Sequence, residues 1–158
     1  MSACVIPFFY SCDTAKGYIG DTLPKEETAI LDHQTEALPA GAEGVAIYFV
    51  NSISVGSYTK GWPNSIYLKS GTNIIEAAYF NSHERAVDMG GGLIQGAINS
   101  EADKKQYHSS HQKLSLDASA GHSYIAKFYS PAHSYTNAIL WIEDENSGDV
   151  VSGRKPNN

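Results

Sequence analysis

The chain has 158 residues, of which 42% are hydrophobic and 18% are charged, and its formal net charge is -6. This length suits a single domain, and the apolar share is typical of a folded chain rather than a disordered one. The acidic balance and the scattered Lys and Arg residues argue against a phosphate-binding surface. We therefore expect no nucleic acid among the partners.

The first 43 residues are predicted to form an extended N-terminal arm. They combine an aromatic cluster at Phe8, Phe9 and Tyr10 with scattered Gly and Pro residues, which interrupt regular structure. Within the arm, residues 28–31 form a short apolar run after two acidic residues. This run fits either one helical turn or an edge strand, and the pattern leaves both open.

From residue 44 the pattern changes to short β-branched and aromatic runs separated by turn residues, which is typical of strands. We expect an all-β fold: a two-sheet antiparallel β-sandwich of about seven or eight strands over residues 44–153, with a disordered tail at 154–158. The expected strands cover residues 45–56, 65–69, 73–80, 113–118, 123–129, 138–143 and 149–151.

Connections between these strands are also predicted. Residues 61–64 are expected to form a turn, and Ser70 with Gly71 is expected to join two strands in a hairpin. Residues 146–148 fit a reverse turn, and Trp141 is expected to anchor the core between the sheets. The long connection 81–112 holds two possible short helices, at 84–89 and 100–107.

Three histidines are candidate metal ligands. His108 and His111 have a ligand-like spacing, and His83 belongs to the same connection. Exposed loop histidines give the same pattern, and we favour that interpretation. The acidic run at residues 143–145 is a candidate calcium site or a solvated strand end, and the glycine-rich stretch 90–96 lacks the features of a phosphate-binding loop. We expect no cofactor and no catalytic residue.

The residues before and at Cys4 suggest a membrane anchor. Ser2, Ala3 and Cys4 read like the end of a bacterial lipoprotein signal, in which the cysteine carries the lipid, and we expect Met1 to stand in place of a removed leader. The alternatives are a disulfide between Cys4 and Cys12 in an oxidising compartment and two free thiols in a cytosolic protein. The two modifications exclude each other at Cys4.

Several short motifs resemble a family of small bacterial envelope lipoproteins of unknown function. The family's C-terminal half typically reads Ala-Gly-His-x-Tyr and later Trp-Ile-x-Asp with a glycine turn, as residues 120–124, 141–144 and 147–151 do here. Residues 18–20, 23–30 and 47–79 are similar too. Departures are Ser70, where the family often has Pro, and the long insertion at 81–112. The resemblance implies a periplasm-facing β-sandwich without a catalytic site.

The leading hypothesis is a non-enzymatic cell-envelope binding or structural lipoprotein, anchored at Cys4 on the periplasmic side of a membrane or secreted. Its expected partner is a protein or another envelope component, with membrane contact only through the lipid. One alternative is an adaptor subunit of a secretion machine, with residues 81–112 as a protruding loop. Another is a secreted metal-dependent hydrolase that uses His83, His108 and His111.

Overall fold

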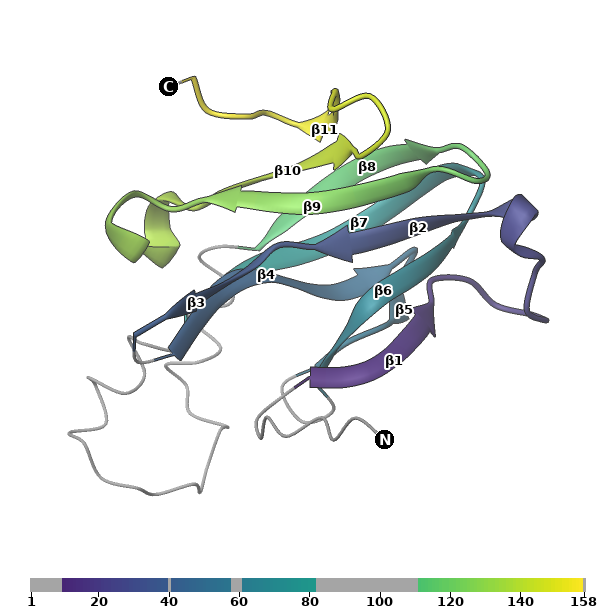
Figure 1. Ribbon diagram of the computed structural model, residues 1–158, viewed down its shortest axis with the longest axis horizontal. Helices are drawn as coiled ribbons and strands as arrows, with labels where there is room; N and C mark the ends of the chain where they lie inside the picture. Colours follow the sequence, from purple (N-terminus) through teal and green to yellow (C-terminus); the bar gives the residue numbers. More distant parts are fainter. Residues whose placement is uncertain (1–9, 40, 58–60, 82–110, 158) are drawn as a thin grey trace, which may run out of the picture.

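The computed structural model describes residues 10–39, 41–57, 61–81 and 111–157, which form two packed sheets (Figure 1). Three single 3-10 turns accompany the strands: η1 (Lys25–Glu27), η2 (Pro131–His133) and η3 (Tyr135–Asn137). The strands are β1 (Tyr10–Lys16), β2 (Thr28–His33), β3 (Thr35–Leu38), β4 (Gly41–Val50), β5 (Ile53–Ser54), β6 (Trp62–Lys69), β7 (Gly71–Asn81), β8 (Gln112–Ala118), β9 (Ser123–Tyr129), β10 (Ile139–Asp144) and β11 (Val150–Gly153).

The expected all-β sandwich is confirmed, with more strands than the pattern predicted. The first sheet has the order β1-β6-β2-β9-β10-β11, and the second has the order β3-β4-β7-β8, with β5 paired to β4. Most pairs are antiparallel, but β1 pairs with β6 and β2 pairs with β9 in parallel. The parallel pairs join segments that lie far apart in the sequence.

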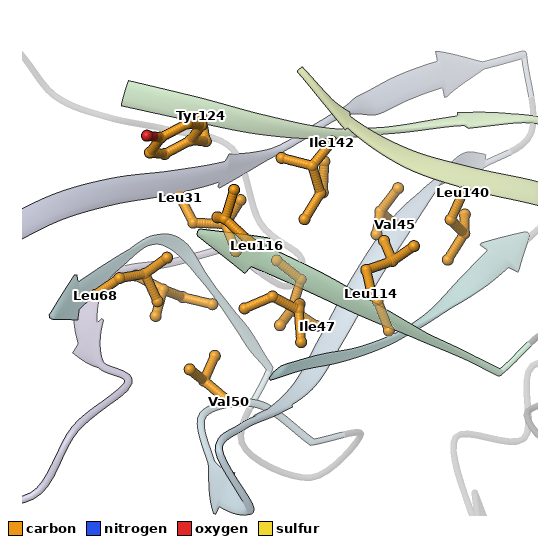
Figure 2. Close-up of a cluster of buried hydrophobic side chains, with 14 of the residues drawn as sticks. Leu31, Val45, Ile47, Val50, Leu68, Leu114, Leu116, Tyr124, Leu140 and Ile142 are labelled. Carbon is orange, nitrogen blue, oxygen red and sulfur yellow. The ribbon is translucent and has the colours of Figure 1, made fainter. Parts of the chain in front are cut away.

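The core lies between the two sheets, where alternating side chains from both inner faces meet (Figure 2). In β8, Leu114, Leu116 and Ala118 are buried and the residues between them are exposed. This period of two is what a strand with one solvated face produces. β4 differs, since its residues 43–48 are buried in succession because both faces of this strand are covered.

The described residues among the first 43 do not form the expected extended arm. They contribute β1, β2 and β3, and β2 lies inside the first sheet between β6 and β9. Ala29 and Leu31 are fully buried there. The sequence pattern was ambiguous because a short apolar run fits a helical turn as well as a strand, and the neighbours that decide the matter come from residues 65–69 and 123–126.

The hairpin predicted at Ser70 and Gly71 is also wrong. β6 belongs to the first sheet and β7 to the second, so the chain crosses between the layers at this point. Gly71 has a φ of +100°, a conformation that favours glycine. Asn73, which is 2% exposed, donates from Nδ2 to the carbonyls of Lys69 and Gly71, and its Oδ1 accepts from the side chain of Asn51.

Two other local predictions had different outcomes. The turn expected at residues 61–64 is wrong, because β6 already begins at Trp62 and includes Pro63. Pro63 is tolerated there because it lies beyond the residues of β6 that pair with β2. The reverse turn at residues 146–148 is confirmed between β10 and β11. The helices expected at 84–89 and 100–107 lie outside the described residues.

We predict that Asn73→Ala lowers the free energy of unfolding by about 1–3 kcal/mol, because it removes the three hydrogen bonds of a buried side chain. Urea unfolding followed by fluorescence measures the change. The matched control is Asn64→Ala, at an exposed position of β6, which should leave the midpoint nearly unchanged. Equal effects of the two substitutions would show that Asn73 does not secure the crossing.

Candidate functional site

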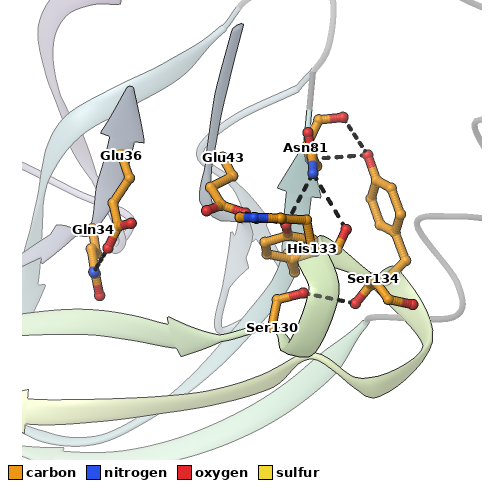
Figure 3. Close-up of polar contacts among 9 residues, drawn as sticks. Gln34, Glu36, Glu43, Asn81, Ser130, His133 and Ser134 are labelled. Atoms are coloured by element: carbon orange, nitrogen blue, oxygen red, sulfur yellow. Dashed lines mark hydrogen bonds and ion pairs between the residues drawn. The ribbon is translucent and has the colours of Figure 1, made fainter. Parts of the chain in front are cut away.

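A cluster of polar side chains surrounds Glu43, near the end of the sandwich where β9 leads into η2 and η3 (Figure 3). Glu43 is 4% exposed, and its Oε2 accepts from the Tyr79 hydroxyl at 2.5 Å and lies 2.8 Å from Nδ1 of His133. Glu43 stands opposite Asn81 in the pairing of β4 with β7. Tyr79 and Asn81 are two residues apart on β7, so they face the same side.

Tyr79 joins this cluster to the hydrophobic core. Its ring packs against Phe128 and Tyr135, each with a centroid distance of 5.3 Å. Burial of the ring, with the hydrogen bond to Glu43, raises the pKa of the Tyr79 hydroxyl well above its ordinary value. The hydroxyl therefore stays neutral and serves as a donor to the carboxylate.

Asn81 and Tyr135 connect the cluster to the following turns. The Tyr135 hydroxyl accepts from the backbone N–H of Asn81 at 2.9 Å and donates to its carbonyl at 2.7 Å. The Asn81 side chain donates to the Tyr79 hydroxyl and to the carbonyl of His133, both at 3.3 Å. A long β7 is thus fixed to two turns that lie more than fifty residues later in the chain.

The turn that presents His133 has an uncommon backbone conformation. Ala132 and His133 have φ values of +53° and +56°, in the left-handed region that non-glycine residues seldom adopt. Such strain persists only where surrounding contacts enforce it. Here the contact of His133 with Glu43, and the bond from Ser130 Oγ to the carbonyl of Ser134, hold the turn.

A second polar cluster lies on the outer face of the first sheet, around the carboxylate of Glu143. This carboxylate accepts from Nζ of Lys127, Nε1 of Trp141 and Nζ of Lys155, at 2.5, 2.8 and 3.0 Å. Trp141 therefore does not anchor the core as predicted. Leu140 and Ile142 point into the core, and alternation along β10 places Trp141 and Glu143 on the opposite face.

The C-terminal motifs that resemble envelope lipoproteins come together where β9 begins and β10 ends, away from the Glu43 cluster. Nδ1 of His122 lies 2.7 Å from Oδ2 of Asp144, and Tyr124 is the cross-strand neighbour of Asp144. Oδ1 of Asp144 accepts from the backbone N–H of Asn146 and that of Ser147. The motifs at residues 120–124, 141–144 and 147–151 therefore form one local unit that closes two turns.

The site residues predicted from the sequence are not brought together in the described part of the structure. Cys4, His83 and His108 lie outside the described residues. Nε2 of His111 lies 3.3 Å from Oε2 of Glu76, which also contacts Lys113. In the described part of the chain, no group of three or more His, Cys, Asp or Glu side chains is placed to hold a metal ion. The calcium site considered at residues 143–145 is thus not formed.

Aromatic side chains gather on the outer face of the second sheet. Trp62 stacks on Phe80 with a centroid distance of 5.8 Å and meets Tyr48 edge-on at 5.9 Å. They pack against Ala46 and Ala78, apart from the main core. Tyr48 is buried, and Trp62 and Phe80 are partly buried, so these rings pack mainly against one another and against the sheet.

Sequence reasoning missed the Glu43 cluster. One signal was present: Glu43 lies two residues before the apolar run that begins at Val45, and a carboxylate in a buried strand needs donors. The local sequence pattern could not identify those donors, because Tyr79 and His133 come from distant segments of the chain.

Comparisons of the chain with protein-family models, with curated proteins and with solved structures gave no match. In the part of the chain that the structure describes, no helix is long and apolar enough to span a bilayer. The geometry of the site and the sequence motifs are therefore the basis for a functional proposal.

We predict that Tyr79→Phe destabilises the protein by about 1–3 kcal/mol, because Glu43 loses a donor while it stays buried. Chemical unfolding measures the change. Tyr129→Phe, at a residue that is 47% exposed, is the matched control and should have little effect. A neutral result for Tyr79→Phe would show that the hydroxyl does not support the carboxylate.

We also predict that stability falls as the pH drops from about 4.5 toward 2. Burial alone would raise the pKa of Glu143, but hydrogen bonds from Lys127, Trp141 and Lys155 lower it from 4.5 to about 2. A hydrogen bond from His122 lowers the pKa of Asp144. Because these pKa values are lower in the folded state, both carboxylates stabilise the fold at higher pH, and protonation removes that contribution.

The measurement is the free energy of unfolding across this pH range, with Glu143→Gln beside the parent protein. The substitution should flatten the pH dependence, whereas Glu145→Gln, at an exposed neighbouring position, should leave it unchanged. An unaltered slope for Glu143→Gln would contradict the assignment.

Proposed function

We propose that the protein is a non-enzymatic module of the bacterial cell envelope, tethered through a lipid on Cys4, which binds or supports another envelope component. One structural observation carries the non-enzymatic part. The three most deeply buried carboxylates in the described part of the chain, Glu43, Glu143 and Asp144, accept hydrogen bonds from other strands or turns. Their chemistry is used to hold the sandwich together.

The envelope part of the proposal is supported by the sequence. Ser2, Ala3 and Cys4 match the end of a lipoprotein signal, and β1 begins at Tyr10, so a short segment separates the proposed anchor from the fold. The motifs that resemble envelope lipoproteins serve structural roles here, because His122 and Asp144 bind each other and fix neighbouring turns. These features favour a rigid domain held close to a membrane surface.

The Glu43 cluster gives less support to a catalytic or metal-binding function than to a structural one. A carboxylate that orients an imidazole is common to acid-base catalysis and metal binding. In this protein, however, the same Oε2 also accepts from Tyr79, and Asn81 ties the His133 backbone to β7. These contacts connect β4, β7 and the turns after β9, which favours a structural role for the cluster.

The experiment is expression of the full native gene in a bacterial host, followed by membrane fractionation and intact mass measurement. We expect the protein in the membrane fraction, with a mass increase that corresponds to a diacylglycerol and an acyl group on Cys4. Cys4→Ser should abolish both. Cys12→Ser is the matched control and should retain them.

A soluble protein of unmodified mass would contradict the tether. A mass lower by two hydrogen atoms in that species would instead indicate an oxidised disulfide between Cys4 and Cys12. Metal analysis of the purified protein distinguishes the hydrolase alternative from the non-enzymatic proposal. A stoichiometric bound metal that is lost in His111→Ala would contradict the non-enzymatic proposal.

A further inference from the structure

The outer edge of the second sheet is formed by β8, and it has the features of a strand that pairs with another strand. Among the described residues, β8 is the last strand of its sheet and pairs only with β7. A strand in that position presents unpaired N–H and C=O groups along one side. The edge lies on the same side of the sandwich as β11 (Figure 1).

The space beside this edge is partly open. A groove of about 420 Å³ runs between residues 113–115 of β8 and residues 150–153 of β11. Val150 and Val151 border it and are 40% and 39% exposed. An added strand would cover part of this apolar surface and supply partners for the backbone groups of β8.

The side chains of β8 show which strand would fit. Lys113, Ser115 and Asp117 are the exposed positions, and they are placed symmetrically about Ser115. If two copies of β8 pair in antiparallel fashion about that residue, Lys113 of each copy lies directly opposite Asp117 of the other. Opposite charges at directly paired positions stabilise a sheet, and like charges destabilise it.

We propose that the protein forms a two-fold symmetric dimer through antiparallel pairing of β8 with β8 of a second copy. The pairing joins the second sheets of the two copies into one continuous sheet. A two-fold dimer requires that the same residues of both copies form the interface, and antiparallel pairing of β8 with β8 meets this requirement. Two Lys113–Asp117 pairs fix the register, and Ser115 of the two copies meets at the symmetry axis.

Lys113 is free to take part because its side chain is 64% exposed, although it already contacts Glu76 on β7 at 3.1 Å. In the dimer it lies between Glu76 of its own chain and Asp117 of the other copy. The lysine then neutralises carboxylates on both sides, and the interface gains a charge pattern that opposes a one-residue slip.

The test uses single charge-reversing substitutions in the full-length chain. Sedimentation under reducing conditions, over a wide range of protein concentration, measures the oligomeric state. We expect the parent protein to dimerise, and Lys113→Asp and Asp117→Lys each to raise the dimer Kd at least about tenfold, because each places like charges opposite one another at both pairs. An equimolar mixture of the two variants should dimerise again, since each copy then meets opposite charges.

Lys25→Asp and Glu26→Lys, both in the exposed turn η1, are the matched controls and should dimerise like the parent. A parent protein that stays monomeric, variants that dimerise normally, or a mixture that remains monomeric would each overturn the proposal. These outcomes do not depend on lipidation, so they are independent of the proposed envelope function.

A covalent test fixes the register. Ser115→Cys, in a chain with Cys4 and Cys12 replaced by serine, should form a disulfide-linked dimer under mild oxidation, because directly opposite residues of an antiparallel pair lie within disulfide range. Ser70→Cys, at an exposed turn position, should remain monomeric under the same conditions. Equal cross-linking of the two variants, or none at residue 115, would contradict the pairing.

Discussion

A carboxylate that is removed from water needs donors, and in this protein each buried carboxylate has at least one donor from another segment of the chain. Glu43 is bound by Tyr79 and His133, Glu143 by two lysines and Trp141, and Asp144 by His122 and two turn amides. Each acid thereby determines where a neighbouring strand or turn must lie. Hydrophobic burial brings the two sheets together, and these contacts select one arrangement of their ends.

The two ends of the sandwich use this constraint differently. At the Glu43 end, the ring of Tyr79 belongs to the core and its hydroxyl belongs to the polar cluster, so apolar packing and carboxylate binding support each other. At the Asp144 end, the carboxylate acts within a tight turn and on the first residue before β9. The first cluster joins the two sheets, whereas the second orders strands within one sheet.

The sequence predicted those elements whose signal is local. Alternation of Leu114 and Leu116 identified β8, and the glycine-containing stretch at 146–148 identified the turn before β11. The interior position of β2 was missed because its neighbours lie in β6 and β9, and local composition holds no information on them. The Glu43 cluster was missed for the same reason, since its donors are distant in sequence.

The connection at Ser70 and Gly71 shows a related limit. Two short strands and a tight turn usually make a hairpin, yet here the turn carries the chain from one layer to the other. The buried amide of Asn73, which binds the carbonyls of Lys69 and Gly71, is the feature that distinguishes the two outcomes. A single polar residue at the start of an apolar strand was too weak a signal to change the prediction.

The parallel pairing of β2 with β9 has a consequence for the order of assembly. Residues 30–33 of β2 pair on one side with residues 123–126 of β9, which the ribosome makes much later. The first sheet therefore closes only after residues 123–126 have emerged, and long-range pairing of this kind slows folding. Until then β2 has a partner on one side only, so the backbone hydrogen-bonding groups along its other side remain unpaired.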